Sequence, residues 1–363
     1  MVTMPRLMAT TTVPRRWRSC LAVGLAAAVL GGCTASDRAT DRASPGDTIA
    51  HGFPLRVVRD IPLPGGTTRL DYQDLDPRTQ RLYIAHLGDG TVDVVDTARL
   101  DVVATIDDLD AVHGIRLAPD LHRLYASATG SDEVATIDTT TNQVITRAPT
   151  GDFPDGIAYD PDTRKVYVSN ANDRAETVVD AQTGQRLGAI DIGGSAGNSA
   201  YDQRTKHVLV NVQDRGHIAV IDPHTDAVID TIDTPDCESN HGLYIDPENE
   251  LAFVACEGNA TLLTIDLQTG TLVDSHDVGD TPDVLAYDPQ LRRLYVASES
   301  GTVTIFDEQD GKLSQVGRAH VADSAHTVAV DPATHRVYLP LENVGGRPVV
   351  RVLEPTDGSR RDR

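Results

Sequence analysis

A four-residue landmark recurs along this chain at a nearly constant spacing. Its second position is aromatic or aliphatic, and successive second residues lie 42, 42, 42, 44, 42 and 43 positions apart. A fixed period of this size is typical of a solenoid, an array or a propeller. Apolar residues alternate within each period, which indicates strands and excludes helical repeats of similar length. The landmarks are Leu82-Tyr83-Ile84-Ala85, Leu124-Tyr125-Ala126-Ser127, Val166-Tyr167-Val168-Ser169, Val208-Leu209-Val210-Asn211, Ala252-Phe253-Val254-Ala255, Leu294-Tyr295-Val296-Ala297 and Val337-Tyr338-Leu339-Pro340.

Each period contains four strand patterns joined by short turns. The landmark is the second strand. In most periods the first strand ends in an Asp-Pro turn, in which Asp bonds the backbone ahead and Pro presets φ; these turns begin at Asp76, Asp160, Asp246, Asp288 and Asp331. The third strand ends in Asp as well, at Asp96, Asp138, Asp180, Asp222, Asp266 and Asp307. Four short strands in a unit of this length make one propeller blade.

The periods number six complete units and a seventh, from His326, that lacks a fourth strand. A strand pattern without partners stands near the other end of the chain, at 55–61. Pairing this N-terminal strand with the last three strands closes the ring and removes an open sheet edge. The sequence therefore predicts an all-β fold, a seven-bladed β-propeller of four-stranded blades. We expect the propeller to span 54–354 and a polar tail to span 355–363.

The first residues have the pattern of an export signal. Arg15, Arg16 and Arg18 precede an apolar run at 21–30, which has signal-peptide length and is too short for a membrane span. The following Leu30-Gly31-Gly32-Cys33 resembles the bacterial lipobox, which implies a signal peptide at 1–32 and lipidation of Cys33. A plain secretory signal is the alternative, and Arg15-Arg16 leaves twin-arginine export open. We expect a flexible tether at 33–53 and a protein anchored by lipid to the outer face of the cytoplasmic membrane, or to another extracytoplasmic membrane.

The net charge of the chain argues against two classes of binding partner. The formal net charge is −22, whereas nucleic-acid phosphates need a basic surface, so we expect no nucleic-acid partner. An acidic body also does not dock on anionic lipid by charge, so the membrane contact is expected through the anchor alone. We expect a monomer whose partner is a small molecule, a metal or a protein.

Two segments carry a family resemblance. Tyr167-Val168-Ser169-Asn170 with the later 176–180, and the run 279–289, resemble the YVTN-type (YncE-like) β-propeller repeat. The resemblance covers about 54–354. It implies the propeller fold and an exported bacterial protein, but no activity. The single Trp, Trp17, lies in the predicted signal peptide, so Trp-Asp repeat propellers are excluded as close relatives.

One aligned position offers an acidic or imidazole side chain in six of the seven periods. It lies six residues before the Pro of the first turn, or its equivalent, and comprises Asp71, His113, Asp155, Gly197, His241, Asp283 and His326. In a propeller this position enters the first strand at the central channel. We expect a second tier after the landmark, at His86, Asn170, Gln213, Glu257, Glu299 and Glu342. Together the two tiers predict an acidic, His-bearing funnel that binds a ligand.

The funnel residues suit a divalent transition metal such as Zn²⁺, Ni²⁺, Cu²⁺ or Fe²⁺. Blades 7, 1 and 2 are neighbours in the closed ring, so His326, Asp71 and His113 form the candidate metal set. We expect ligands on opposite blades to lie too far apart. The alternative is that these residues hydrogen-bond loop backbones and cap the inner strands.

Two cysteines remain in the body, Cys237 and Cys256. If the hairpin turns at 247–249, Cys256 lies opposite Asn240 or His241, within reach of Cys237. In an oxidising compartment this pair predicts a disulfide. A soft-metal or redox site made of Cys237, Cys256 and His241 is the competing interpretation.

The sequence contains no phosphate-binding glycine loop, His-Glu-x-x-His or haem-attachment motif. It therefore favours a binding module of unknown ligand over an enzyme, and no catalytic residue is assigned. The alternatives are a metal-dependent enzyme of the propeller lyase or lactonase kind and a metal-binding protein that uses the same Asp and His residues.

Overall fold

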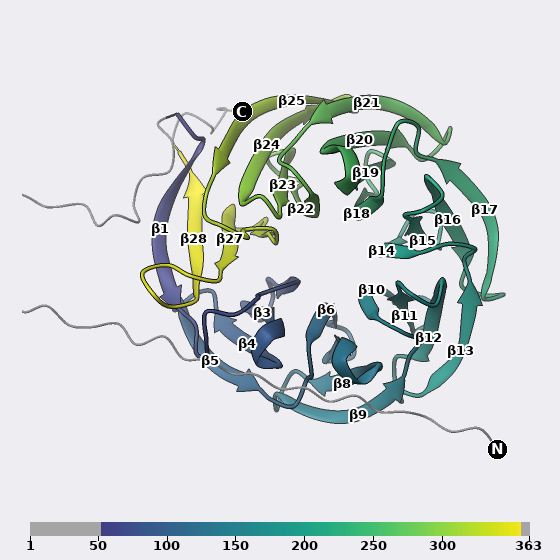
Figure 1. Cartoon of the computed structure of the whole chain (residues 1–363), viewed down its shortest axis with the longest axis horizontal. Helices are drawn as coiled ribbons and strands as arrows, with labels where there is room; N and C mark the ends of the chain where they lie inside the picture. Colours follow the sequence, from purple (N-terminus) through teal and green to yellow (C-terminus); the bar gives the residue numbers. More distant parts are fainter. Residues whose placement is uncertain (1–51, 357–363) are drawn as a thin grey trace, which may run out of the picture. The chain divides into compact units, whose positions relative to one another are not determined.

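The computed structural model describes residues 52–356. Within this range, 28 strands form seven four-stranded antiparallel sheets arranged as a ring around a central channel (Figure 1). The first strand of each blade lies nearest the channel and the fourth lies on the outer rim. The predicted seven-bladed all-β propeller is confirmed.

The first four blades follow one another along the chain. Blade 1 consists of β2 (Gln73–Asp76), β3 (Arg81–His86), β4 (Thr91–Asp96) and β5 (Asp101–Ile106). Blade 2 consists of β6 (Val112–Ala118), β7 (Arg123–Ala128), β8 (Glu133–Asp138) and β9 (Gln143–Pro149). Blade 3 consists of β10 (Pro154–Asp160), β11 (Lys165–Asn170), β12 (Ala175–Asp180) and β13 (Arg186–Asp191). Blade 4 consists of β14 (Ala196–Asp202), β15 (His207–Val212), β16 (His217–Asp222) and β17 (Ala227–Asp233).

The remaining blades complete the ring. Blade 5 consists of β18 (Asn240–Asp246), β19 (Leu251–Cys256), β20 (Thr261–Asp266) and β21 (Thr271–Asp277). Blade 6 consists of β22 (Pro282–Asp288), β23 (Arg293–Ser298), β24 (Thr302–Gln309) and β25 (Lys312–His320). Blade 7 consists of β26 (Ala329–Asp331), β27 (Arg336–Leu341), β28 (Val349–Pro355) and β1 (Leu55–Pro62). Short 3₁₀ turns follow three of the second strands, at Leu87–Asp89, Thr129–Ser131 and Glu257–Asn259.

Ring closure occurs in blade 7, where the two ends of the propeller meet. β1 pairs antiparallel with β28, from Leu55 opposite Pro355 to Pro62 opposite Val349, and Figure 1 shows the two strands side by side. A bidentate ion pair between Arg351 and Asp60, at 2.7 and 2.8 Å, joins the same strands. The predicted closure by the N-terminal strand is therefore confirmed.

Asp side chains form the turns as expected. At the end of the first strands, Asp76, Asp160, Asp246, Asp288 and Asp331 each accept a backbone N–H two residues ahead at 2.8–3.0 Å. Most third strands end in the same way, but the expectation for Asp307 is wrong. β24 continues to Gln309 and turns at Asp310-Gly311, which both have positive φ, and this favours a tight two-residue hairpin turn.

The core lies between the blades. The buried apolar residues of the described range form seven clusters, and each cluster joins two neighbouring blades. Landmark aromatics such as Tyr83, Tyr125 and Phe253 are fully buried in them. Because every sheet is covered on both faces by its neighbours, no blade is stable without the next.

Several predicted segments lie outside the described residues: the signal peptide at 1–32, the lipidation site Cys33, most of the tether at 33–53, and 357–363 of the tail. Phe53, which we assigned to the tether, packs in the cluster between blades 6 and 7. Within 52–356, no helix has the length and apolar character needed to cross a membrane.

Candidate functional site

A β-bulge at the start of the innermost strand directs side chains into the channel. In blade 3, Pro154 pairs with Asn170 and the next pair is Ile157 with Val168, which leaves Asp155 unpaired between them. The first strands of blades 2, 4, 5 and 6 carry the same shift. A bulge re-aims the side chains it contains. In blades 2 to 6 the aligned position falls in this bulge, whereas Asp71 and His326 stand in the segments just before β2 and β26.

The residue after the aligned position is Gly where the next blade comes closest. A Cβ on Gly114 or Gly242 would lie 2.0 Å from the carbonyl oxygen of Asp155 or Asp283, on the following blade. Ser127 and Asn211 then bind these approaching backbones: Ser127 donates to the carbonyl of Asp155 at 2.7 Å, and Asn211 to that of His241 at 2.8 Å. Each blade therefore positions the channel residue of its neighbour.

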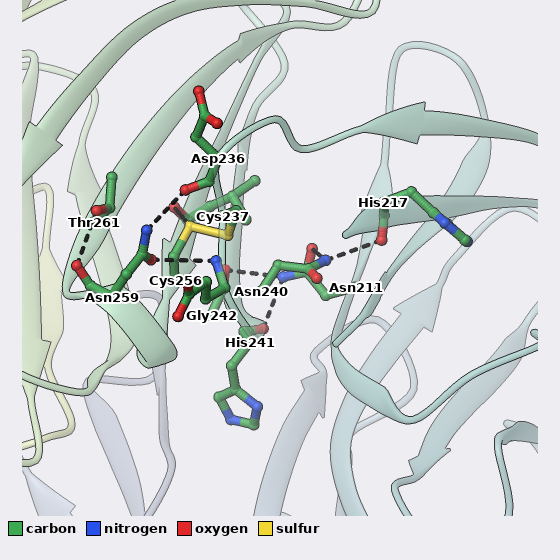
Figure 2. The surroundings of a disulfide bond; sticks show 12 residues. Asn211, His217, Asp236, Cys237, Asn240, His241, Gly242, Cys256, Asn259 and Thr261 are labelled. Carbon is green, nitrogen blue, oxygen red and sulfur yellow. Dashed lines mark hydrogen bonds between the residues drawn. A yellow bond between two sulfur atoms is a disulfide. The ribbon is translucent and has the colours of Figure 1, made fainter. Parts of the chain in front are cut away.

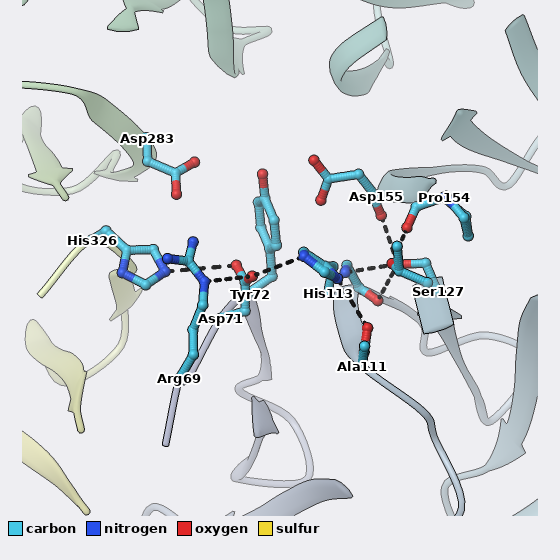
Figure 3. A network of polar contacts seen from close by, with 12 residues as sticks. Arg69, Asp71, Tyr72, Ala111, His113, Ser127, Pro154, Asp155, Asp283 and His326 are labelled. Carbon is cyan, nitrogen blue, oxygen red and sulfur yellow. Dashed lines mark hydrogen bonds and ion pairs between the residues drawn. The ribbon is translucent and has the colours of Figure 1, made fainter. Parts of the chain in front are cut away.

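The channel residues differ little in burial. Asp71, Asp155, His241, Asp283 and His326 are all buried, and His113 is half-buried. Gly197 contributes no side chain in blade 4. The six remaining members of the aligned position thus come together around one polar centre, and Figure 3 shows all of them except His241.

Asp71 lies at the middle of this centre. Arg69 Nε is 3.5 Å from its carboxylate, His326 Nε2 is 3.7 Å away and His113 Nε2 is 4.0 Å away. Within residues 52–356, neither Asp71 oxygen has a hydrogen-bond partner, and His326 Nε2 has none either. The Nδ1 atom of His326 lies 2.9 Å from the Ser324 carbonyl, so Nδ1 carries the proton and Nε2 faces Asp71.

His241 forms the second half of the centre. Its Nε2 lies 3.3 Å from Asp283 Oδ1 and 3.0 Å from the Tyr72 hydroxyl, and its Nδ1 lies 2.6 Å from the Gln213 amide. Burial alone would lower the pKa of His241, but the neighbouring carboxylate of Asp283 outweighs it and raises the pKa to about 10. The same balance, with Asp71 as the neighbouring carboxylate, raises the pKa of His326 to about 9.

Tyr72 is a site residue that we did not expect. Its hydroxyl donates to Asn198 Oδ1 at 2.8 Å and contacts His241, so a side chain from blade 1 reaches blades 4 and 5. We expected ligands on opposite blades to lie too far apart, but the long Tyr72 side chain spans this distance. The sequence did contain a signal for this residue. Tyr72 stands directly after the aligned position, where blades 2, 3 and 5 have Gly.

The second tier combines two different strand positions, which corrects our alignment. His86 and Asn170 are the last residues of β3 and β11, whereas Gln213, Glu257, Glu299 and Glu342 come one residue after the second strand. Successive side chains of a strand point to opposite faces. His86 accordingly lies 3.1 Å from Thr68 Oγ1, and Asn170 bonds the backbone of Gly151 at 2.9 Å. Both fit the alternative that such residues secure loops.

The four later members face the channel. Glu299 binds Arg69 at 2.7 Å and lies 3.6 Å from His326, Gln213 contacts His241, and Glu257 lies 4.0 Å from His241. Burial raises the pKa of Glu257 and of Glu342. In blade 3, burial raises the pKa of Asp155 to about 6, with Asp71 and Asp283 adding to the rise.

Three-residue groups with metal-ligand geometry occur twice in this centre. Asp71, Asp283 and His326 form one group, and His241, Glu257 and Asp283 form the other, with ligand atoms within 4.8 Å of one another in each. His113 belongs to neither. Figure 3 gives the reason: His113 and His326 approach Asp71 from opposite sides, and His113 packs against Phe153 with ring centroids 5.2 Å apart. Among the described residues, the group around Asp71 and His326 therefore contains Asp283 and not His113.

The predicted disulfide between Cys237 and Cys256 is confirmed, with Cα atoms 5.3 Å apart (Figure 2). Cys256 pairs with Asn240 across the β18–β19 ladder, as expected from the hairpin. The competing interpretation as a thiol site with His241 is therefore wrong. The disulfide ties the loop before His241 to the strand that ends directly before Glu257.

A cavity of about 350 Å³ occupies another part of the channel. Tyr72, Gly114, Gly156 and Asn198 line it, and its lining continues along the innermost strands to Pro77, Pro289 and Pro332. Its lining includes none of the aligned Asp and His residues. Tyr72 and Asn198 therefore stand between the cavity and the polar centre.

Comparison with known proteins supports the fold and leaves the function open. No family model matches the chain, and a search of curated proteins finds no match. Among solved structures, hydrazine synthase of Kuenenia stuttgartiensis is similar with a TM-score of 0.68 and 17% identity. The superposition covers 89% of this chain and 99% of that chain. At this identity the likeness shows the propeller fold alone.

Proposed function

We propose that this protein is a binding propeller whose ligand is a divalent transition metal, held in the central channel by Asp71, Asp283 and His326. One observation carries the proposal: carboxylate and imidazole atoms of all three residues are buried and have no hydrogen-bond partner among residues 52–356. A buried polar atom that makes no hydrogen bond is costly. A cation bound among these atoms removes that cost.

The donor set favours particular metals. One imidazole and two carboxylates form a harder ligand set than the two-His set expected from the sequence, and they suit Mn²⁺, Fe²⁺ or Zn²⁺ more than Cu²⁺. The Ser324 carbonyl orients His326 through Nδ1, as backbone acceptors do for metal-binding histidines. Half-buried Glu257, Glu299 and Glu342 provide an acidic route by which a cation enters.

We also propose a cellular location and a family for this protein. The lipobox-like Cys33 supports a lipid-anchored exported protein, and the disulfide supports an oxidising compartment. The landmark repeats support membership of the YVTN-type family. The net charge of −22 supports cation binding and argues against a nucleic-acid partner, and we propose a monomer.

The test compares two histidines of similar geometry. The full chain is purified without chelator, loaded with Mn²⁺, Fe²⁺ or Zn²⁺, dialysed, and analysed by plasma mass spectrometry. We expect bound metal in the wild type and in His113→Ala, and a loss of affinity of more than roughly 100-fold in His326→Ala, because a lost ligand costs more than a lost outer contact. The exposed variant Asp277→Asn controls for net charge. Metal-free wild type that takes up none of these ions contradicts the proposal.

A metal-dependent enzyme of the lyase or lactonase kind is the second candidate. It is favoured by Tyr72, whose hydroxyl contacts His241 at 3.0 Å while His241 contacts Asp283 at 3.3 Å. A hydroxyl, an imidazole and a carboxylate in series are able to move a proton beside a metal. Turnover of a lactone or a uronic-acid polymer that is lost in Tyr72→Phe with metal retained would favour the enzyme.

A further inference from the structure

We infer that the channel holds a second divalent cation, bound by His241, Glu257 and Asp283, with Asp283 bridging the two ions. The inference rests on the proposed function and deepens it from a single ion to a two-ion centre. It starts from a residue that both metal-ligand groups share, since Asp283 is the only member common to the two sets found in residues 52–356.

The two groups have the same composition. Each combines one imidazole and one carboxylate of its own, His326 with Asp71 and His241 with Glu257, and each completes its set with Asp283. A carboxylate has two oxygen atoms and therefore can bind one ion with each. Ions bridged in this way lie about 3.5–4 Å apart in two-metal sites.

The shared carboxylate is placed for this role. Asp283 is buried at 4% exposure, and its Oδ1 has no hydrogen-bond partner in the described part of the chain although His241 Nε2 lies 3.3 Å away. Glu257 reaches the same point from the rim, 4.0 Å from His241. A cation between these atoms satisfies a buried oxygen that the protein itself leaves unpaired.

The charges of the centre also suit two ions. Two divalent cations bring four positive charges, and the three ligand carboxylates Asp71, Asp283 and Glu257 bring three negative ones. Asp155 Oδ1 is also buried and unpaired within 52–356, and Glu299 lies 3.6 Å from His326. Glu299 is half-buried and already pairs with Arg69 at 2.7 Å, so Asp155 is the further buried carboxylate that a second cation helps to balance.

The chain supports the second ligand pair independently of the first. The disulfide joins Cys256, next to Glu257, to Cys237 in the loop that leads to His241, and Figure 2 shows His241 beyond this bridge. Asn211 holds the backbone of His241 and Gly242 with donated hydrogen bonds of 2.8 and 3.0 Å. His241 and Glu257 are therefore positioned before any ion arrives.

The experiment counts and probes the ions in the full chain with Mn²⁺. Manganese content is measured after gel filtration, and electron paramagnetic resonance reports whether the ions are magnetically coupled. We expect two Mn²⁺ per chain with a coupled spectrum. Glu257→Gln retains one Mn²⁺ with the spectrum of an isolated ion, and Asp283→Asn lowers the occupancy of both sites. Glu248→Gln, an exposed change in the same blade, retains both ions.

Each alternative outcome has one meaning. One uncoupled Mn²⁺ in the wild type, with the same content in Glu257→Gln, overturns the second site and leaves the proposed function intact. No bound Mn²⁺, Fe²⁺ or Zn²⁺ in the wild type overturns both proposals. Circular dichroism verifies folding, and His241→Asn removes the same ion if Glu257→Gln does not fold.

Discussion

Two histidines show how single residues acquire different roles in equivalent positions. His113 and His326 both direct Nδ1 to a backbone carbonyl two residues earlier, at 2.9 Å, and both face Asp71 with Nε2. Only His326 also meets Asp283, because the two rings lie on opposite sides of Asp71. The aligned sequence position predicts which side chains enter the channel. Which of them lie close enough to share a ligand depends on the direction of approach.

Glu176 is a buried acid outside the channel. It is fully buried at a position of the third strand where the other blades have Val92, Val134, Ile218, Leu262, Val303 and Val350. Ser169 donates to its Oε1 at 2.7 Å, while Oε2 has no hydrogen-bond partner in residues 52–356. Burial raises its pKa from 4.5 to about 8. The carboxyl is therefore protonated in the folded protein at neutral pH.

This shift predicts a specific dependence of stability on pH. The folded state holds the Glu176 proton up to about pH 8, whereas the unfolded chain releases it near 4.5, so the stabilising contribution is complete below pH 4.5 and lost as pH rises through 8. Between pH 5 and 8.5, urea unfolding of wild type should lose about 4 kcal/mol relative to Glu176→Gln. Glu133→Gln, an acid in the neighbouring blade, should follow wild type. Parallel pH profiles for wild type and Glu176→Gln would contradict the assignment.

At the level of elements, the disulfide connects a loop and a strand that carry site residues. Cys237 and Cys256 are 19 residues apart, and a loop of this size corresponds to about 3 kcal/mol of stability. We expect Cys237→Ser with Cys256→Ala to lower the free energy of unfolding by about this amount. The same variant should bind the ion at His241 and Glu257 more weakly while the ion at Asp71 and His326 is retained.

Chemical denaturation and metal titration measure the two effects separately. Adding reductant to the wild type should reproduce both of them, and adding it to the double variant should change nothing. An unchanged unfolding midpoint in the double variant would show that the disulfide does not constrain this hairpin.

The second strands show where prediction of elements fails. We placed His86 and Asn170 in one tier with Glu257 and Glu299, although they stand one residue earlier relative to the strand end. A shift of one residue in a strand reverses the face of the side chain. All seven second strands have six residues, with the second residue of the landmark in third place. The register was therefore readable from the sequence, and the error lay in combining residues three and four positions after that landmark residue.

At the level of the whole molecule, β1 closes the ring. Its removal should lower the stability of the fold more than the removal of any other element. Leu55 and Ile61 of this strand are buried at 3% and 1% exposure, and its loss would expose the edge of β28. We expect a chain lacking 1–62 to associate in solution and to melt at least roughly 10 °C lower. A chain lacking 1–51 should remain monomeric and keep its melting temperature.

Light scattering after gel filtration and thermal unfolding test this expectation. A synthetic peptide of residues 52–66 should restore the shorter chain by occupying the edge of β28. A chain lacking 1–62 that is monomeric and equally stable would show that closure by β1 contributes little.

The amino-acid sequence by itself determined the repeat, the strands, the seven blades, the closing strand and the disulfide. These properties follow from local periodicity, from turn residues and from the placement of two cysteines in one hairpin, all of which lie within short segments of the chain. It also determined which aligned position faces the channel. The convergence at Asp283, the reach of Tyr72 across the channel and the exclusion of His113 were decided only by tertiary structure. They depend on bulge direction, side-chain length and approach angles between blades that are distant in sequence, and no local pattern records these quantities.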